Sequence, residues 1–296
     1  MSSNRISPCL FVIMVLAILF SVAFRVHGQA SIPNPSPTPQ PSATLTLERQ
    51  FFKNILLDQE AIWTSPFHLR GRDARWLAPL GLATAAFVST DQSTGDEIAE
   101  SRRQLHASRI VSYAGSDYGT GGLALTFYLV GRARHDDRAR ETGLLGAEAL
   151  VDSAIVVTTL KEITQRSRPL SGKSRSDFFD GGSSFPSGHS IAAWSLATVI
   201  SREYHDRPVV QVAAYGIAGA VSVARFTGEK HYLSDVLVGS AMGYGIGRYV
   251  YHAHHRRRAD EGGADESRGP SHAWPLIAPQ YNRHAREYGA AIAWSF

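Results

Sequence analysis

"SSFPSGHSIAAWSLATVIS", residues 183–201, joins a polar loop rich in Gly and Ser to an apolar run. Ser187, Gly188 and His189 stand where the apolar run begins, so the sequence predicts a helix that starts at Gly188 or His189. The first turn of a helix has free backbone N–H groups. Together with Ser187 and the small Gly188, these groups form a nest for an anion. We therefore expect the His189 imidazole at the rim of an anion site.

Comparable runs recur along the chain. Uncharged stretches occupy 76–90, 118–131, 208–224 and 236–247, and residues 46–62 and 143–161 repeat apolar side chains at helical spacing. Strand-like alternation is absent from this region. The pattern predicts an all-α fold, a bundle core of about six to eight helices. Gly239, Gly243 and Gly247 recur every fourth residue, which lets a neighbouring helix approach closely in soluble and membrane bundles alike.

The two ends of the chain differ in composition from this helical part. Arg5, the apolar run 6–24 and the small residues Gly28 and Ala30 are typical of a signal peptide, with an uncleaved anchor as the alternative. At the other end, Tyr288, Ala290, Ile292, Trp294 and Phe296 alternate as in a strand. We expect a signal peptide or anchor at 1–30, a Pro-rich linker at 31–45, a helical domain at 46–255, a charged flexible segment at 256–273 and a C-terminal β-hairpin or strand at 274–296.

Composition narrows the environment and the partners. The net charge of +4 is small and unclustered, so no nucleic acid is expected as a partner. The single cysteine, Cys9, excludes an internal disulfide. The uncharged runs are shorter than the about 20 residues of a membrane span, so we expect an exported, periplasmic domain with a soluble body. The helix at 46–62, with Phe51 and Phe52, could still make peripheral membrane contact.

"KEITQRSRP", residues 161–169, precedes the histidine stretch and carries two cations. Lys161 and Arg168 are seven residues apart, which places both on one face of a helix. Pro169 is expected to end that helix. Taken alone, this segment is better explained as a solvated basic face.

"ARFTGEKHYLSD", residues 224–235, follows an apolar helix and carries a cation, an imidazole and a carboxylate. Arg225 lies at the helix end or inside a site. His231 and Asp235 are four residues apart, so on a new helix they would share a face. A carboxylate bonded to one imidazole nitrogen fixes the tautomer and raises the basicity of the other nitrogen. An ordinary surface pair remains the alternative for these two residues alone.

Taken together, the three stretches have the order K-x6-R-P, P-S-G-H and R-x5-H-x3-D. They resemble the superfamily of type 2 phosphatidic acid phosphatases, bacterial non-specific acid phosphatases and vanadium haloperoxidases, over residues 145–250. That family usually has Ser before the third-motif Arg, where this chain has Ala224. The resemblance implies that His231 is the nucleophile, oriented by Asp235, and that His189 is the general acid and base. It implies phosphate binding by Lys161, Arg168, Ser187, Gly188 and Arg225.

The resemblance implies a metal-independent phosphatase that cleaves phosphate monoesters through a phosphohistidine. No cofactor is expected, although vanadate could bind as an inhibitor or as a haloperoxidase cofactor. The substrate stays open between a lipid phosphate and a small phosphomonoester, and Phe178, Phe179 and Phe185 either form an apolar rim or pack the loop. The alternatives are an undecaprenyl-diphosphate or other integral lipid phosphatase, a vanadate-dependent haloperoxidase, and an inactive anion- or lipid-binding homologue.

Overall fold

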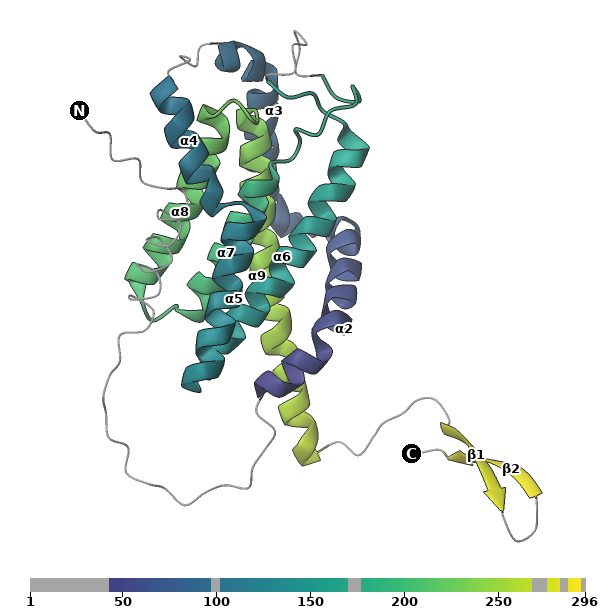
Figure 1. Cartoon of the computed structure of the whole chain (residues 1–296). Coiled ribbons are helices and arrows are strands. Elements are labelled where there is room, and N and C mark those ends of the chain that lie inside the picture. Colours follow the sequence, from purple (N-terminus) through teal and green to yellow (C-terminus); the bar gives the residue numbers. More distant parts are fainter. Residues whose placement is uncertain (1–42, 97–101, 170–176, 268–275, 283–286, 294–296) are drawn as a thin grey trace. The chain divides into compact units, whose positions relative to one another are not determined.

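The computed structural model describes residues 43–96, 102–169, 177–267, 276–282 and 287–293 (Figure 1). The predicted signal peptide or anchor at 1–30 and nearly all of the Pro-rich linker lie outside the described residues. The helical part confirms the all-α prediction for the described residues before 268.

The helices are α2 (Ala43–Thr64), α3 (Ala74–Asp96), α4 (Arg102–Ala114), α5 (Asp117–Arg134), α6 (Asp137–Thr164), α7 (Gly188–Glu203), α8 (Pro208–Thr227) and α9 (Leu233–Ser267). Two short 3-10 turns, η1 (Ser65–His68) and η2 (Gly71–Asp73), join α2 to α3. Helix α9 continues to Ser267, through residues where the sequence predicts a flexible charged break. Beyond it, β1 (Leu276–Asn282) pairs antiparallel with β2 (Glu287–Ala293).

Helix α7 lies at the centre of the bundle, between α6 and α8 (Figure 1). Its apolar side chains divide between two buried clusters. Leu196 and Ile200 pack with residues of α5 and α8, whereas Ile191 and Val199 pack with residues of α6 and α9. Because both flanks of α7 are buried, the position of its first residues is fixed by the whole core.

The glycine stripe of α9 brings that helix against α7, which confirms the predicted close approach. A Cβ on Gly243 would lie 2.4 Å from the carbonyl oxygen of Ile191, and a Cβ on Gly239 would lie 2.8 Å from that of Ser187. No larger side chain fits at such distances. The stripe therefore sets the distance between the start of α9 and the start of α7, the two ends that carry the motif residues.

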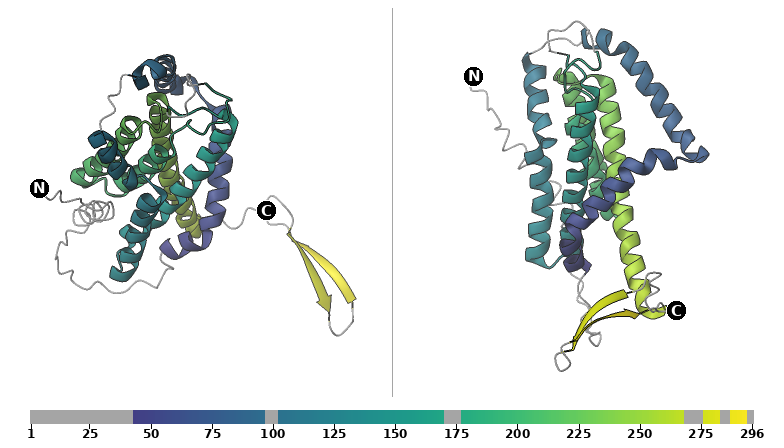
Figure 2. Two further views of the ribbon diagram at one scale, coloured as in Figure 1. Left: turned by 45° about the horizontal axis from the view of Figure 1, so that its top comes forward. Right: turned by 90° about the vertical axis from the view of Figure 1, so that its right-hand side faces the viewer.

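Helices α2 and α3 lie at the edge of the bundle, and Figure 2 shows α3 leaning away from it. Of the α3 side chains that the structure describes, only Asp91 is buried. Large apolar side chains on this edge face outward, including Phe52 (80% exposed), Phe67 (86%) and Trp76 (72%). The predicted membrane-contacting helix therefore lies on an edge that exposes several large apolar side chains.

Among the helices that the structure describes, two have the length and apolar composition of a membrane span. They are α6, with 28 residues, and α8, with 20. The sequence analysis judged span length from uncharged runs alone. That measure was too short, because α6 continues through its acidic residues. Core helices of soluble proteins have the same properties.

The glycine stripe generates a stability prediction. We expect Gly243→Ala to lower the free energy of unfolding by about 1–3 kcal/mol, because its Cβ meets backbone atoms of α7. Gly245→Ala is the matched control on the same helix, since nothing lies within 4 Å of its Cβ. The control should be neutral or gain up to about 1 kcal/mol from helix propensity. Denaturant unfolding of both variants checks the prediction, and equal effects would contradict it.

Candidate active site

The motif residues gather at one end of the bundle, where four helix termini meet (Figure 1). Lys161 is in the last turn of α6, His189 in the first turn of α7 and Arg225 in the last turn of α8. Asp235 is in the first turn of α9. Helix α7 starts at Gly188, as the sequence predicts.

Lys161 lies against the start of α7. A Cβ placed on Gly188 would be 3.6 Å from the Nζ of Lys161, so the ammonium group faces the backbone of that first turn. The absence of a side chain at Gly188 leaves this space open. An anion here would meet an ammonium group and the N–H groups of a helix N-terminus together.

The prediction that Lys161 and Arg168 share a helix face is wrong. Helix α6 ends at Thr164, and Gln165 takes a left-handed conformation with φ of 44° while its N–H bonds to the carbonyl of Lys161. Arg168 therefore lies beyond the helix, in a segment that pairs with the loop before α7. Gly182 and Ser184 donate backbone hydrogen bonds to the carbonyls of Gln165 and Arg166.

The two arginines of the predicted cradle have unused donors. The buried Nε atoms of Arg168 and Arg225 have no hydrogen-bond partner among the described residues. Two guanidinium groups and the Lys161 ammonium close to one another repel, so this arrangement is stabilised when an anion occupies the space between them. Ser187 is fully buried, and its hydroxyl accepts a hydrogen bond from Ser190 at 3.1 Å.

His231 lies just before α9 and not on it, which corrects the prediction of a shared helix face. Glu229 has φ of 54°, and this left-handed turn ends α8 and directs the next residues inward. The His231 ring is 2% exposed, and its Nδ1 lies 2.7 Å from the carbonyl oxygen of Ser184. Only a protonated Nδ1 donates to a carbonyl, so Nε2 carries the free lone pair.

Asp235 lies beside the imidazole, as predicted, but the predicted hydrogen bond between them is not formed. Its Oδ2 is 3.7 Å from His231 Nδ1, beyond hydrogen-bond distance. That oxygen accepts hydrogen bonds from the hydroxyl of Ser184 at 2.5 Å and from the N–H of Tyr232 at 2.9 Å. Asp235 thus fixes the residue whose carbonyl orients His231, and acts on the imidazole through Ser184.

Arg166, which the sequence analysis did not single out, binds Asp235 from the other side. Its Nη1 donates to Asp235 Oδ1 at 2.5 Å and its Nη2 to Asp91 Oδ2 at 2.8 Å. The guanidinium is fully buried between the rings of Phe178 and Tyr232, at 4.7 and 4.5 Å. Its position two residues before Arg168, inside the first motif, was the one sequence signal for a role of Arg166 in the site. Its partner Asp91 could not be predicted in the same way, because it is 75 residues away in the sequence.

The loop aromatics are divided in their roles. Phe178 contacts Arg166 and also packs against the ring of Phe185, at 5.6 Å between centroids. Phe179 is 75% exposed. Two of the three therefore brace the buried arginine, and Phe179 is the one available to an apolar substrate.

His189 is neutral in the substrate-free protein. Burial and the nearby charges of Arg225, Lys161 and Arg168 lower its pKa to about 3. Burial also lowers the pKa of His231, although Asp235 opposes this. A bound phosphate ester would replace repulsion by attraction and raise the pKa of His189, so the imidazole would become an acid only when substrate is present.

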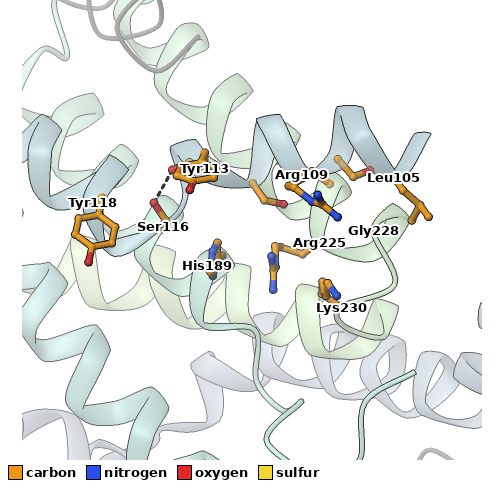
Figure 3. Close-up of a pocket in the computed structure, with 12 residues that line it drawn as sticks. Leu105, Arg109, Tyr113, Ser116, Tyr118, His189, Arg225, Gly228 and Lys230 are labelled. Atoms are coloured by element: carbon orange, nitrogen blue, oxygen red, sulfur yellow. Dashed lines mark hydrogen bonds between the residues drawn. The ribbon is translucent and has the colours of Figure 1, made fainter. Parts of the chain in front are cut away.

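A pocket of about 490 Å³ leads to this cluster (Figure 3). His189 and Arg225 line it, whereas Lys161, Arg168 and His231 are not among its lining residues. Opposite His189 and Arg225, residues of α4 line the pocket. Of the clustered groups, His189 and Arg225 thus face a pocket that is open to solvent.

Comparisons with known proteins show which family and relatives this chain is similar to. Residues 142–259 match the model of the PAP2 superfamily. Over 103 residues the chain is 32% identical to the lipid A 1-phosphatase of Porphyromonas gingivalis, which covers 34% of this chain. The chain spans about a quarter (23%) of the length of that curated relative. A transmembrane PAP2-type phosphatidylglycerolphosphate phosphatase from Bacillus subtilis aligns with a TM-score of 0.43 and 18% identity, over 72% of this chain and 96% of that one.

Removing the Asp235 charge should affect stability as well as chemistry. We expect Asp235→Asn to lower the free energy of unfolding by about 3 kcal/mol, because Arg166 loses one of two buried carboxylates. Asp206→Asn is the matched control, since Asp206 pairs with Arg138 at the surface, and it should cost less than about 1 kcal/mol. Denaturant unfolding measures both, and an Asp235→Asn variant as stable as the control would contradict the role of Arg166.

The depressed pKa of His189 predicts a pH dependence of stability. The unfolded chain binds this proton near pH 6.5, but the folded chain only near pH 3. Between these values the unfolded state holds more protons, so stability falls as pH decreases, by up to about 1.4 kcal/mol per pH unit. We expect His189→Gln to flatten the pH dependence measured by unfolding at pH 7, 6 and 5, whereas the exposed control His205→Gln should not.

Saturating inorganic phosphate should flatten the same slope in the unmodified protein, because the bound anion raises the pKa of His189. A slope that neither His189→Gln nor phosphate alters would contradict the assignment.

Proposed function

Because the chain belongs to the PAP2 superfamily, we propose that it hydrolyses phosphate monoesters of lipids at a membrane, through a phosphohistidine intermediate. The observation that carries this proposal is the proximity of His231 and three cations to His189, which lines a pocket together with Arg225. The proposal corresponds to the lipid phosphatase, integral or membrane-associated, that the sequence analysis gave as an alternative. We now prefer this function to the hydrolysis of small soluble phosphate esters.

Three observations favour a lipid substrate. The relative with 32% identity is a phosphatase of lipid A. Helices α6 and α8 have the length and composition of spans. Exposed apolar side chains on α2 and α3, such as Phe52 and Trp76, suit a membrane surface. An exported, periplasmic location remains our proposal from the N-terminal sequence.

The reaction divides into two displacements. In the first, Nε2 of His231 attacks phosphorus, a P–N bond forms, and the ester P–O bond breaks while His189 donates a proton to the leaving alcohol. In the second, His189 takes a proton from water, whose oxygen attacks phosphorus, and the P–N bond breaks. Inorganic phosphate and free His231 result.

The cations stabilise the charge that develops on the phosphoryl oxygens. Lys161, Arg168 and Arg225 surround the site and the Gly188 backbone leaves room for the anion. The side chains alone supply positive charge in our scheme, and it includes no metal. The Ser187 hydroxyl accepts a hydrogen bond from Ser190, so its own O–H proton can be donated to a phosphoryl oxygen. Ala224 supplies no hydroxyl next to Arg225.

The chemical roles can be separated by variants. We expect His231→Ala to abolish both phosphate release and labelling of the protein by 32P-phosphatidic acid in detergent micelles. His189→Ala should slow phosphate release by about 10²- to 10⁴-fold, yet still allow labelling from p-nitrophenyl phosphate, whose leaving group needs little acid assistance. Turnover by the unmodified enzyme should be faster on micellar phosphatidic acid than on p-nitrophenyl phosphate at equal concentration.

Other outcomes would redirect the proposal. Near-normal turnover by His231→Ala would overturn the nucleophile assignment. Faster turnover of p-nitrophenyl phosphate than of the lipid would favour a phosphatase of small esters. Bromination of a dye with vanadate and peroxide, without phosphatase activity, would indicate a haloperoxidase. Phosphate binding without any turnover would indicate an inactive anion- or lipid-binding homologue.

A further inference from the structure

Helix α4 forms one wall of the active-site pocket with a single face. The α4 residues that line the pocket are spaced three and four apart, as one helix face requires: Leu105, Ser108, Arg109, Ser112 and Tyr113. This helix lies outside residues 142–259, which match the superfamily model. The wall is therefore built by a part of the chain that the superfamily motifs do not define.

Two hydrogen bonds fix α4 against the end of α8. Gln104 donates to the carbonyl of Thr227 at 3.2 Å, and the hydroxyls of Ser108 and Thr227 lie 2.8 Å apart. Thr227 ends the helix that carries Arg225. The side chains of α4 are thus held in register with the cation cluster, as selection between substrates requires.

The pocket contains two cations besides Arg225. Arg109 extends from α4, and Lys230 extends from the turn that follows α8. Figure 3 shows both beside Arg225, on the side of the pocket away from His189. Neither side chain makes a hydrogen bond or an ion pair with any residue that the structure describes. Three cations at one end of a pocket repel unless an anion lies between them.

The reacting phosphate does not need all of these charges. Lys161, Arg168 and Arg225 all lie near enough to His189 to act on its charge. Lys161 and Arg168 are not among the lining residues of the outer pocket, whereas Arg109 and Lys230 are. The two outer cations are therefore placed for a different part of the substrate than the phosphoryl group that is transferred.

We propose that Arg109 and Lys230 form a second anion subsite, which selects lipid phosphates that carry another anionic group next to the one removed. That group is either the inner phosphate of a diphosphate or a separate phosphate or phosphodiester. The inference rests on the proposed function and names its substrate class. Arg presents two parallel donors to phosphate oxygens and Lys adds a point charge, which suits a phosphoryl group. Leu105, Tyr113 and Tyr118 offer apolar surface in the same pocket for the start of a lipid chain.

The experiment compares two pairs of substrates with the full-length protein in micelles. The first pair is farnesyl diphosphate and farnesyl monophosphate. The second is dioctanoyl phosphatidylglycerol phosphate and dioctanoyl phosphatidic acid. We expect kcat/KM to be about tenfold higher for the member with two anionic groups in at least one pair, and that pair identifies the kind of second anion. The preference should weaken as salt is raised.

The variants Arg109→Gln and Lys230→Gln assign the preference to residues. Each should reduce kcat/KM for the preferred two-anion substrate by about five- to tenfold, mostly through KM. Each should change the one-anion partner by less than twofold. Arg109→Lys should keep most of the preference because it keeps the charge. Arg103→Gln is the matched control, since Arg103 is an exposed cation of the same helix that does not line the pocket.

Three results would overturn the subsite. They are equal rates within both pairs, equal losses on both members in the variants, or the same loss in Arg103→Gln as in Arg109→Gln. Failure of the proposed function gives a different result, because the unmodified protein would then release phosphate from none of the four substrates. Both Gln variants change exposed side chains, and an unchanged melting temperature verifies that they fold.

Discussion

The buried guanidinium of Arg166 joins the parts of the chain that make the site. It binds Asp91 of α3 and Asp235 of α9, and lies between the rings of Phe178 and Tyr232. A fully buried cation is tolerable only when its charge and donors are satisfied, so these partners cannot be altered independently. The loop before α7 and the turn before α9 are thereby held to one point. Arg166 pairs with Asp235, which in turn lies next to His231, the proposed nucleophile.

Hydrogen bonds connect Arg166 to His231 through Asp235 and Ser184. One carboxylate oxygen of Asp235 faces Arg166, and the other accepts the Ser184 hydroxyl. The Ser184 carbonyl then accepts the proton on Nδ1 of His231 and leaves Nε2 free. The Ser184 carbonyl orients the imidazole, and Asp235, which is also paired with Arg166, lies 3.7 Å from Nδ1 and partly offsets the lowering of the His231 pKa by burial. This arrangement favours a neutral nucleophile in a site that is otherwise rich in positive charge.

The features of the fold and the site that could be predicted from the sequence are those that depend on residues close together in the chain. Helical periodicity predicted the all-α core, and the Gly239, Gly243 and Gly247 spacing predicted the close α7–α9 contact. Motif spacing identified the residues of the cation cluster, but not their backbone. The left-handed residues Gln165 and Glu229 carry Arg168 and His231 off the expected helices, and neither is a residue type that marks such turns. The Asp91–Arg166 pair joins residues 75 positions apart, which no local pattern reports.

The division between a fixed inner site and a variable outer wall follows from the same geometry. Lys161, His189, Arg225 and Asp235 sit on helix ends that the core clusters and the glycine stripe hold in place, so a change there disturbs both packing and chemistry. Helix α4 contacts this framework mainly along α8, and its pocket-facing side chains are bound to few other groups. Residues such as Arg109 can therefore change without rearranging the proposed catalytic groups. In this structure the bundle fixes the proposed catalytic groups, whereas the proposed choice among phosphate esters depends on helix α4, which lines the pocket.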